Sequence, residues 1–159
     1  MKVRTGLGGA VLAGLMCMAA PAASAEAECA GKRSPHRLTV EVTGLRAAQG
    51  QVAVTLYPDD GRRFLATRGK LARQRVVARS PVTQACFWLP QAGVYAIAVY
   101  HDANADEDFN RSRTNGMPIE GFGFSNDAPT KIGLPEFAKV RFRARAGESS
   151  IRIALRYLR

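Results

Sequence analysis

Short segments in which apolar and polar residues alternate recur along the chain. The first covers residues 38–43, and the second covers residues 51–57, where Val52, Val54 and Leu56 share one face. An alternation with a period of two is typical of a strand with one buried face. Because only the short connection of residues 44–50 separates them, we predict that the two segments pair as an antiparallel hairpin.

Further strands are predicted in the rest of the chain. A weak strand is expected near residues 75–79, a firmer one at residues 82–89, and one at residues 94–101 that is apolar on both faces and therefore central. Residues 140–145 and 151–157 alternate cleanly and are predicted to form a last hairpin, after one helical turn near residues 135–138.

These segments predict an all-β protein with six or seven short strands. The expected architecture is an antiparallel β-sandwich, immunoglobulin-like or transthyretin-like, with one long loop rich in Asp, Asn and Gly. The length of 159 residues suits one domain. We assign residues 26–159 to this single domain.

The first 25 residues have the features of a cleavable signal peptide. Lys2 and Arg4 precede an apolar stretch at residues 7–20, and Ala23-Ser24-Ala25 supplies the small residues of a cleavage site. A membrane anchor is the alternative, but the apolar stretch is short for a bilayer span. We expect an exported protein, periplasmic or extracellular, with no transmembrane segment after signal removal.

Two cysteines, Cys29 and Cys86, remain outside the predicted signal peptide. In an exported protein they are expected to form a disulfide. Two separate buried thiols are the alternative.

Residues 102–134 show no strand or helix pattern and begin with oxygen-bearing side chains at every second position. This spacing suits a hard cation such as calcium. An EF-hand is excluded because Glu107 stands where that motif needs Gly and Arg113 where it needs Glu. Glu120 or Asp127 could complete a site instead, and a loop of Asx turns without metal is the alternative. The predicted ligands are Asp102, Asn104, Asp106, Asp108, Asn110 and Glu120.

The same loop carries large apolar residues, namely Phe109, Met117, Ile119, Phe122 and Phe124. Five such residues need a surface to pack against, so they are expected to anchor the loop on the sandwich. A second interpretation is that Phe122 and Phe124, flanked by Gly121 and Gly123, form part of a ligand platform.

The formal net charge of +10 favours anionic partners. Export and the lack of a recognition helix or aromatic ladder argue against nucleic acid. The outward positions of the last predicted hairpin could bind an anionic cell-envelope component. A solvated face that blocks edge-to-edge aggregation is the alternative. These positions are Arg141, Arg143, Arg145, Arg152 and Arg156.

No complete catalytic constellation is visible. His101 beside Asp102 could serve in acid–base chemistry or zinc binding, but no nucleophile stands at a recognisable spacing. We therefore expect a non-enzymatic binding or structural module of the cell envelope with a calcium-stabilised loop. The alternative is a protein that associates with anionic lipid or polysaccharide through the arginine-lined face.

Residues 89–126 also carry a family resemblance. The run contains Leu-Pro-x-x-Gly-x-Tyr-Ala, then His-Asp-x-Asn-x-Asp, then Gly-x-Pro-x-Glu-Gly-x-Gly-Phe-Ser-Asn. It resembles the exported bacterial family catalogued as domain of unknown function 2141, and the likeness extends more weakly to residues 38–57 and 137–138. The resemblance implies a small secreted or periplasmic β-sandwich and carries over no catalytic residue. Many relatives look like Asp-x-Asn-Gly-Asn-Gly here, so Ala105 and Glu107 replace two glycines, which is expected to alter the turn.

Overall fold

A computed structural model describes residues 28–130 and 133–158, so the predicted signal peptide lies outside the described residues. The described chain forms eight strands, a short 3-10 helix η1 (Ser125–Asp127) and a single-turn helix α1 (Phe137–Val140). The strands are β1 (Arg37–Thr43), β2 (Gln51–Pro58), β3 (Ala72–Val77), β4 (Val82–Trp88), β5 (Gly93–Asp102), β6 (Phe122–Phe124), β7 (Phe142–Ala144) and β8 (Glu148–Ala154).

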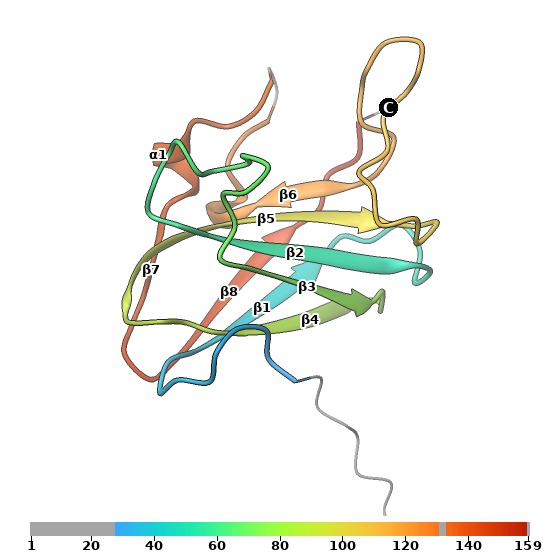
Figure 1. Cartoon of the computed structure of the whole chain (residues 1–159). Coiled ribbons are helices and arrows are strands. Elements are labelled where there is room, and N and C mark those ends of the chain that lie inside the picture. Colours follow the sequence, from blue (N-terminus) through green and yellow to red (C-terminus); the bar gives the residue numbers. More distant parts are fainter. Residues whose placement is uncertain (1–27, 131–132, 159) are drawn as a thin grey trace, which may run out of the picture.

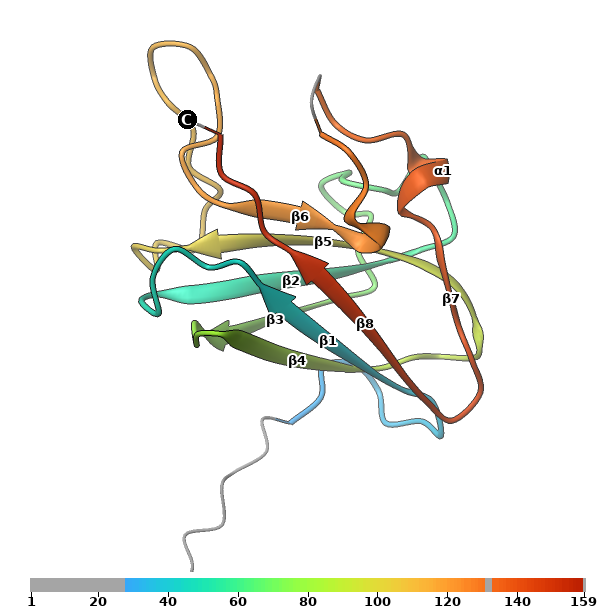
Figure 2. The same ribbon diagram turned by 180° about the vertical axis from the view of Figure 1, so that it is seen from behind.

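The strands form two sheets that pack face to face. One sheet has the order β4-β1-β8, with β1 antiparallel to β4 and parallel to β8. The other has the order β3-β2-β5-β6, and β7 pairs with the first residues of β5 while β6 pairs with later ones. Figure 1 shows the five-stranded sheet in front, with β1 and β8 running obliquely behind it, and Figure 2 shows the three-stranded sheet from the other side. The predicted all-β sandwich is confirmed.

The main hydrophobic core lies between the two sheets. The alternating residues Leu38, Val40 and Val42 of β1 are fully buried and belong to the same cluster as Val54 and Ile97 of the five-stranded sheet. The alternation in the sequence therefore identifies the buried face of each of these strands correctly. β5 is central, as predicted, because it pairs with β2 on one edge and with β6 and β7 on the other.

Both predicted hairpins are wrong. β1 and β2 lie in different sheets, and so do β7 and β8. The connections between them carry the chain across the sandwich, with Gly44, Gly50 and Gly147 in the left-handed region that favours glycine. Alternation fixes which face of a strand is buried but not which strand becomes its neighbour.

The structure contains the predicted disulfide between Cys29 and Cys86. Their Cα atoms are 4.6 Å apart, and the backbone N–H of Ala30 donates to the Cys86 carbonyl. The bond fastens the first described residues to β4, at the edge of the three-stranded sheet. Within the described residues, no helix is long and apolar enough to cross a membrane.

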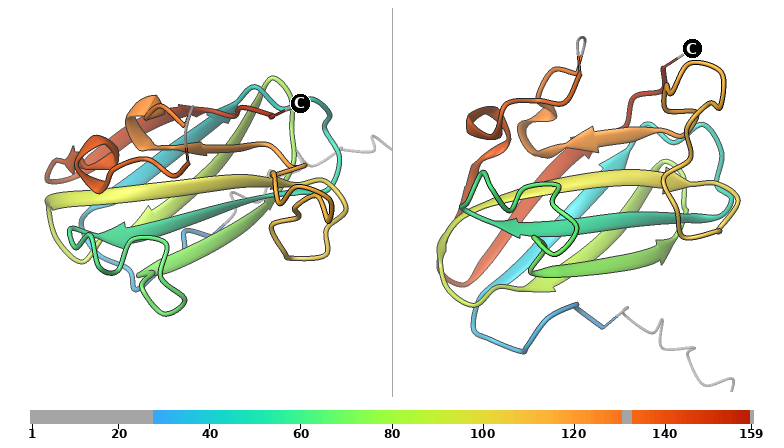
Figure 3. Two further views of the ribbon diagram at one scale, coloured as in Figure 1. Left: turned by 90° about the horizontal axis from the view of Figure 1, so that it is seen from above. Right: turned by 45° about the horizontal axis from the view of Figure 1, so that its top comes forward.

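A second hydrophobic cluster covers the outer face of the five-stranded sheet. Its buried members are Tyr57, Ala96, Phe122, Phe124, Ala128 and Val140. Phe64 and Leu65, from the connection of residues 59–71, pack against this cluster. Figure 3 shows that connection on the outer side of the sheet, with the long loop at one end. The sheet is thus covered on both faces.

Candidate functional site

The strand register places a row of dissimilar side chains across the outer face of the five-stranded sheet. Thr55 is in register with Arg73 on one side and Ala98 on the other, and Ala98 is in register with Phe124. The next row runs in the same order through Arg75, Ala53, Tyr100 and Phe122. The middle strands β2 and β5 therefore present small side chains at Ala53, Thr55 and Ala98 and one aromatic side chain at Tyr100, and Phe122 and Phe124 stand beside them on β6.

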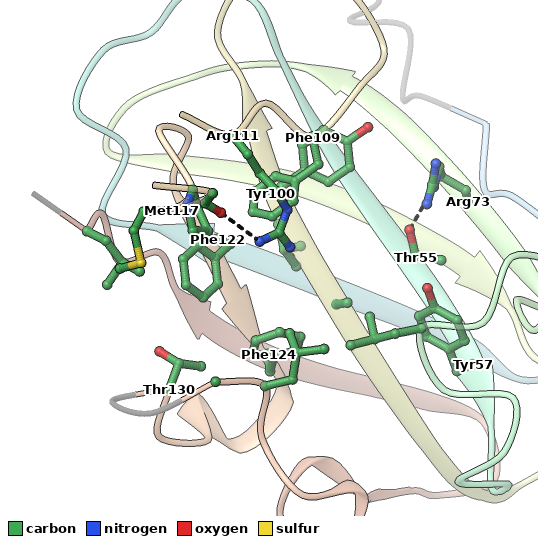
Figure 4. A pocket seen from close by; sticks show the side chains of 18 residues that line it. Thr55, Tyr57, Arg73, Tyr100, Phe109, Arg111, Met117, Phe122, Phe124 and Thr130 are labelled. Carbon is green, nitrogen blue, oxygen red and sulfur yellow. Dashed lines mark hydrogen bonds between the residues drawn. The ribbon is translucent and has the colours of Figure 1, made fainter. Parts of the chain in front are cut away.

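This arrangement leaves a cavity of about 550 Å³ above the sheet. Its floor includes the small side chains of Thr55 and of Ala98, its partner in register. The rings of Tyr57, Tyr100 and Phe124 also line the cavity (Figure 4). Residues from the connection of residues 59–71, from the long loop and from the segment after β8 complete the wall. These are Leu65, Phe109, Arg111, Gly116, Met117, Pro118, Thr130, Gly133, Leu134 and Leu158, together with Phe122 on β6.

The apolar lining continues to the surface at the cavity mouth. Met117 and Leu134 line the cavity and yet are 43% and 63% exposed. Large apolar side chains left in water next to a cavity are typical of a binding site. The cavity is therefore open to solvent along an apolar path.

The charges around the cavity are positive. Arg73 on β3 donates from Nε to Thr55 Oγ1 at 2.8 Å, and Arg111 on the loop donates from Nη1 to the Gly116 carbonyl at 3.3 Å (Figure 4). Burial raises the pKa of Tyr57 and of Tyr100, so both phenols stay neutral at physiological pH. The two guanidinium groups thus carry the charge of the described lining residues.

The acidic start of the loop is held together by hydrogen bonds of its own. Asp102 is fully buried, and its two carboxylate oxygens accept from the N–H groups of Asp106 (3.1 Å) and Glu107 (2.9 Å) and from Gln51 Nε2 (3.0 Å). Asp106 Oδ2 accepts from Asn104 Nδ2 (2.8 Å) and Asn110 Nδ2 (3.0 Å). These bonds match the Asx-turn alternative.

The remaining predicted metal ligands are also hydrogen-bonded within the loop. Asp108 Oδ1 accepts from the N–H of Phe109 at 2.8 Å, and Glu120 Oε2 accepts from the N–H of Asn110 at 2.9 Å. Asp127, the other candidate, accepts from the N–H of Ala154 on β8. Across residues 28–130 and 133–158, no three His, Cys, Asp or Glu side chains form a group able to hold a metal ion. Calcium binding by this loop stays a prediction.

The pKa values of two carboxyl groups of the loop are shifted in opposite directions. Hydrogen bonds, first from the N–H of Asp108 and then from Asn110 and Asn104, lower the pKa of Asp106. Burial raises the pKa of Glu120, and the nearby Asp102 charge adds to that effect. Asp106 is exposed, whereas Glu120 is 6% exposed, so the shifts follow their surroundings.

The two positions where relatives look like glycine keep a glycine-like backbone. Ala105 has φ 56° and Glu107 has φ 67°, both in the left-handed region. A side chain with a Cβ atom is strained in this region, where glycine is not. The expectation that Ala105 and Glu107 alter the turn relative to relatives stays a prediction.

The apolar residues of the long loop divide into two groups. Phe109 packs against Tyr100 with ring centroids 5.5 Å apart and against Phe122 at 5.8 Å. Phe122 and Phe124 are buried on β6, a strand that lies inside the segment predicted to contain none. Anchoring is thus confirmed for these three, but it is wrong for Met117 and for Ile119, which is 60% exposed.

The glycines beside Phe122 and Phe124 face away from the cavity and allow close packing. A Cβ atom on Gly121 would meet the Tyr157 ring at 2.3 Å, and one on Gly123 would meet the Ala154 carbonyl at 2.9 Å. These glycines let β6 approach the chain around β8. Neither glycine lines the cavity.

His101 is a structural bridge in this fold. Its ring is 2% exposed, with Nδ1 2.7 Å from the Tyr157 hydroxyl and Nε2 2.8 Å from the Gln49 carbonyl. Both ring nitrogens are thus engaged, and the ring ties β5 to the segment after β8.

The five arginines predicted as an anion-binding face do not share one hairpin. Arg141 forms two bonds to the Asp59 carboxylate at 2.6 and 2.7 Å, and Arg152 pairs with Glu41 at 2.9 Å. Arg156 donates to the Asp127 carbonyl at 2.9 Å, whereas Arg143 and Arg145 are exposed. Since β7 and β8 belong to different sheets, the predicted common face is absent; anion binding by these arginines stays a prediction.

Sequence reasoning missed most of the cavity. It identified Phe122 and Phe124 but not Arg73, Thr55 or Ala98. The available signal was the pair Ala96 and Ala98 at alternate positions of a strand that is otherwise bulky. These alanines alone do not predict a cavity, because small residues leave open space only where the neighbouring strands present no larger side chain to fill it. Strand register, which decides this, is not visible in the sequence.

A family comparison covers most of this architecture. The family described as uncharacterized protein conserved in bacteria (DUF2141) matches residues 40–152, from β1 into β8. No curated protein and no solved structure matches the chain. The match spans the described lining of the cavity except Leu158, together with the whole acidic loop. The chain therefore belongs to the bacterial family DUF2141.

Proposed function

We propose that this protein is a non-enzymatic binding protein that holds a small, largely apolar ligand in the cavity above the five-stranded sheet. The observation that carries the proposal is the cavity of about 550 Å³, walled by aromatic side chains and floored by Thr55 and Ala98. Small-molecule sites are typically concave, mostly apolar and about 300–1,000 Å³ in volume.

The lining chemistry supports binding rather than catalysis. The polar side chains among the described lining residues are two threonines, two tyrosines and two arginines, without a histidine, cysteine or carboxylate. Such a set offers orientation and charge but no paired nucleophile and base.

The proposal places this binding in the cell envelope or outside the cell. The signal-like residues 1–25 support export, and a disulfide between Cys29 and Cys86 suits an oxidising compartment. An apolar compound in these aqueous spaces needs a protein cavity to shield it from water.

The test is the binding of Nile red, a neutral apolar dye, to three forms of the protein. The wild type is expected to bind the dye, and Ala98→Leu is expected to lower the affinity at least about tenfold, because the added side chain occupies the floor. Ala146→Leu, at an exposed turn between β7 and β8, is the matched control and should bind as the wild type does.

Two outcomes would overturn the proposal. One is the absence of dye binding by the folded wild type. The other is equal binding by Ala98→Leu and the wild type, since the dye would then lie elsewhere. Circular dichroism and a thermal melt verify that each variant is folded.

A further inference from the structure

Two arginines stand at an apolar cavity without a carboxylate partner. Arg73 and Arg111 both line the cavity, and neither takes part in an ion pair among the described residues. Their contacts are to a hydroxyl, a carbonyl and aromatic rings: Arg73 lies over the Tyr100 ring at 5.9 Å, and Arg111 over the Phe109 ring at 5.1 Å.

Two other arginines near the same sheet, Arg75 and Arg141, are paired with acidic residues, whereas Arg143 on β7 is exposed and has no ion pair among the described residues. Arg75, two residues along β3, has its Nε 3.9 Å from the Glu107 carboxylate and donates from Nη2 to the Glu107 carbonyl at 2.6 Å. Arg141 is paired with Asp59. Acidic partners therefore lie beside Arg75 and Arg141, and no described carboxylate lies within ion-pair distance of the two cations that line the cavity.

Arg73 and Arg111 are exposed residues that border an apolar surface. An apolar wall beside a cation strengthens its attraction for an anion relative to a cation surrounded by water. Guanidinium groups bind carboxylates and phosphates with two parallel hydrogen bonds. A neutral apolar ligand would leave both charges without a partner. An amphipathic anion would satisfy the apolar lining and the charges together.

We propose that the ligand of this cavity is an amphipathic anion, with its apolar part over Ala98 and Phe124 and its carboxylate or phosphate bound by Arg73 and Arg111. This inference rests on the function proposed above and names its ligand class. The exposed Met117 and Leu134 at the mouth extend the apolar contact for a chain longer than the cavity.

The experiment compares ligands that share one alkyl chain and differ in the head group. Decanoate, decyl phosphate and neutral decanol are titrated into the full protein as competitors of Nile red. Either or both anions are expected to bind at least about tenfold more tightly than decanol, as charge-assisted hydrogen bonds predict. The two anionic arms distinguish a carboxylate from a phosphate head group. Added salt should reduce the advantage.

Arginine variants assign the effect to the site. Arg73→Met and Arg111→Met keep an unbranched apolar side chain while removing the charge. Each should reduce the difference in affinity between the anions and decanol. Arg79→Met, which removes an exposed charge after the end of β3, is the control and should leave this difference in affinity unchanged.

The results separate this inference from the function on which it rests. If decanol binds as tightly as both anions and Ala98→Leu abolishes all binding, the cavity binds apolar ligands and the anion proposal is wrong. If the anions are preferred but the control variant reduces the difference in affinity as much as the two cavity variants, the assignment to Arg73 and Arg111 is wrong. If neither the dye nor any amphiphile binds, both proposals fail.

Discussion

The acidic start of the long loop, residues 102–110, and the cavity next to it differ in whether their charged side chains have partners within the protein. In the loop, the carboxylates of Asp102 and Asp106 accept hydrogen bonds from neighbouring N–H groups. In the cavity, apolar walls enclose open space and two arginines lack a carboxylate partner. The acidic residues of the loop are therefore part of a structural element whose hydrogen bonds are made within the loop and to Gln51. The cavity, in contrast, has open volume and two arginines that can still bind a ligand.

The two regions are nevertheless mechanically linked. Phe109 follows the acidic residues directly and packs on Tyr100 at the edge of the cavity. Arg111 and Met117, farther along the loop, form part of the wall. The hydrogen bonds of the acidic residues therefore hold the cavity wall in place.

Removing the Asp102 carboxylate should have the largest effect on stability. Asp102→Ala leaves the N–H groups of Asp106 and Glu107 and the amide of Gln51 without their acceptor, so the free energy of unfolding should fall by about 3 kcal/mol. Urea denaturation measures this change, and Nile red affinity should fall with it. Asp108→Ala is the control, because Asp108 is exposed and caps one N–H; a loss equal to that of Asp102→Ala would contradict the account.

Relief of backbone strain at Ala105 should change the free energy of unfolding by less than the loss of Asp102 does, and in the opposite direction. Ala105 has φ 56°, a conformation that glycine adopts without steric cost. We expect Ala105→Gly to raise the free energy of unfolding by about 0.5–1 kcal/mol, while dye binding stays unchanged. Ala146→Gly in the exposed turn after β7 is the control for the added flexibility of glycine, and equal destabilisation of both variants would show that Ala105 is not strained.

Glu120 should produce a weak pH dependence. Burial raises its pKa above the ordinary 4.5, so the folded protein binds the proton more tightly than the unfolded chain does. The contribution of Glu120 to stability therefore increases as pH falls from neutral through the folded pKa towards 4.5. Asp106 acts oppositely: its pKa is lowered, so its stabilisation is present above the ordinary 3.8 and is lost as pH falls below it.

The measurement is the difference in free energy of unfolding between the wild type and Glu120→Gln. This difference should move in favour of the wild type as pH is lowered towards 4.5. A difference that does not change with pH, or that moves the other way, would show that Glu120 is not held in a desolvated site.

Calcium should have the smallest effect. The predicted ligands are hydrogen-bonded to one another and to the backbone, and a cation would have to displace those bonds. Thermal melts with calcium and with a chelator should give the same midpoint. A rise of several degrees with calcium, abolished by Asp106→Ala, would instead support the metal site predicted from the sequence.

The sequence predicts the strands better than their pairing. Alternation at Leu38, Val40 and Val42 identifies a buried face because side chains on a strand alternate between its two faces. The neighbour of each strand depends on whether a connection turns back or crosses the sandwich. Residues 44–50 cross it, and short length alone does not reveal that.

The acidic loop and the cavity also differ in how far sequence could reveal them. Asp102 and Asp106 are close in sequence, so their Asx turns were foreseeable as an alternative. The cavity requires Thr55, Ala98 and Arg111 from distant segments to meet. The cavity forms because Ala98 is small and its neighbours on the adjacent strands leave the space above it open. Those neighbours are set by strand register, which no local sequence pattern shows.

The most direct test of the central claim is an NMR titration of the isotope-labelled protein with decanoate and, separately, with decyl phosphate. We predict that shift changes concentrate on Thr55, Tyr57, Ala98 and Phe124, with little change at Asp106 and Asp108 in the acidic loop. A second cavity, of about 460 Å³, is lined by residues that include Tyr95 and Arg143. Changes centred on that cavity or on the acidic loop would contradict the account, as would the absence of any change at a high ligand concentration.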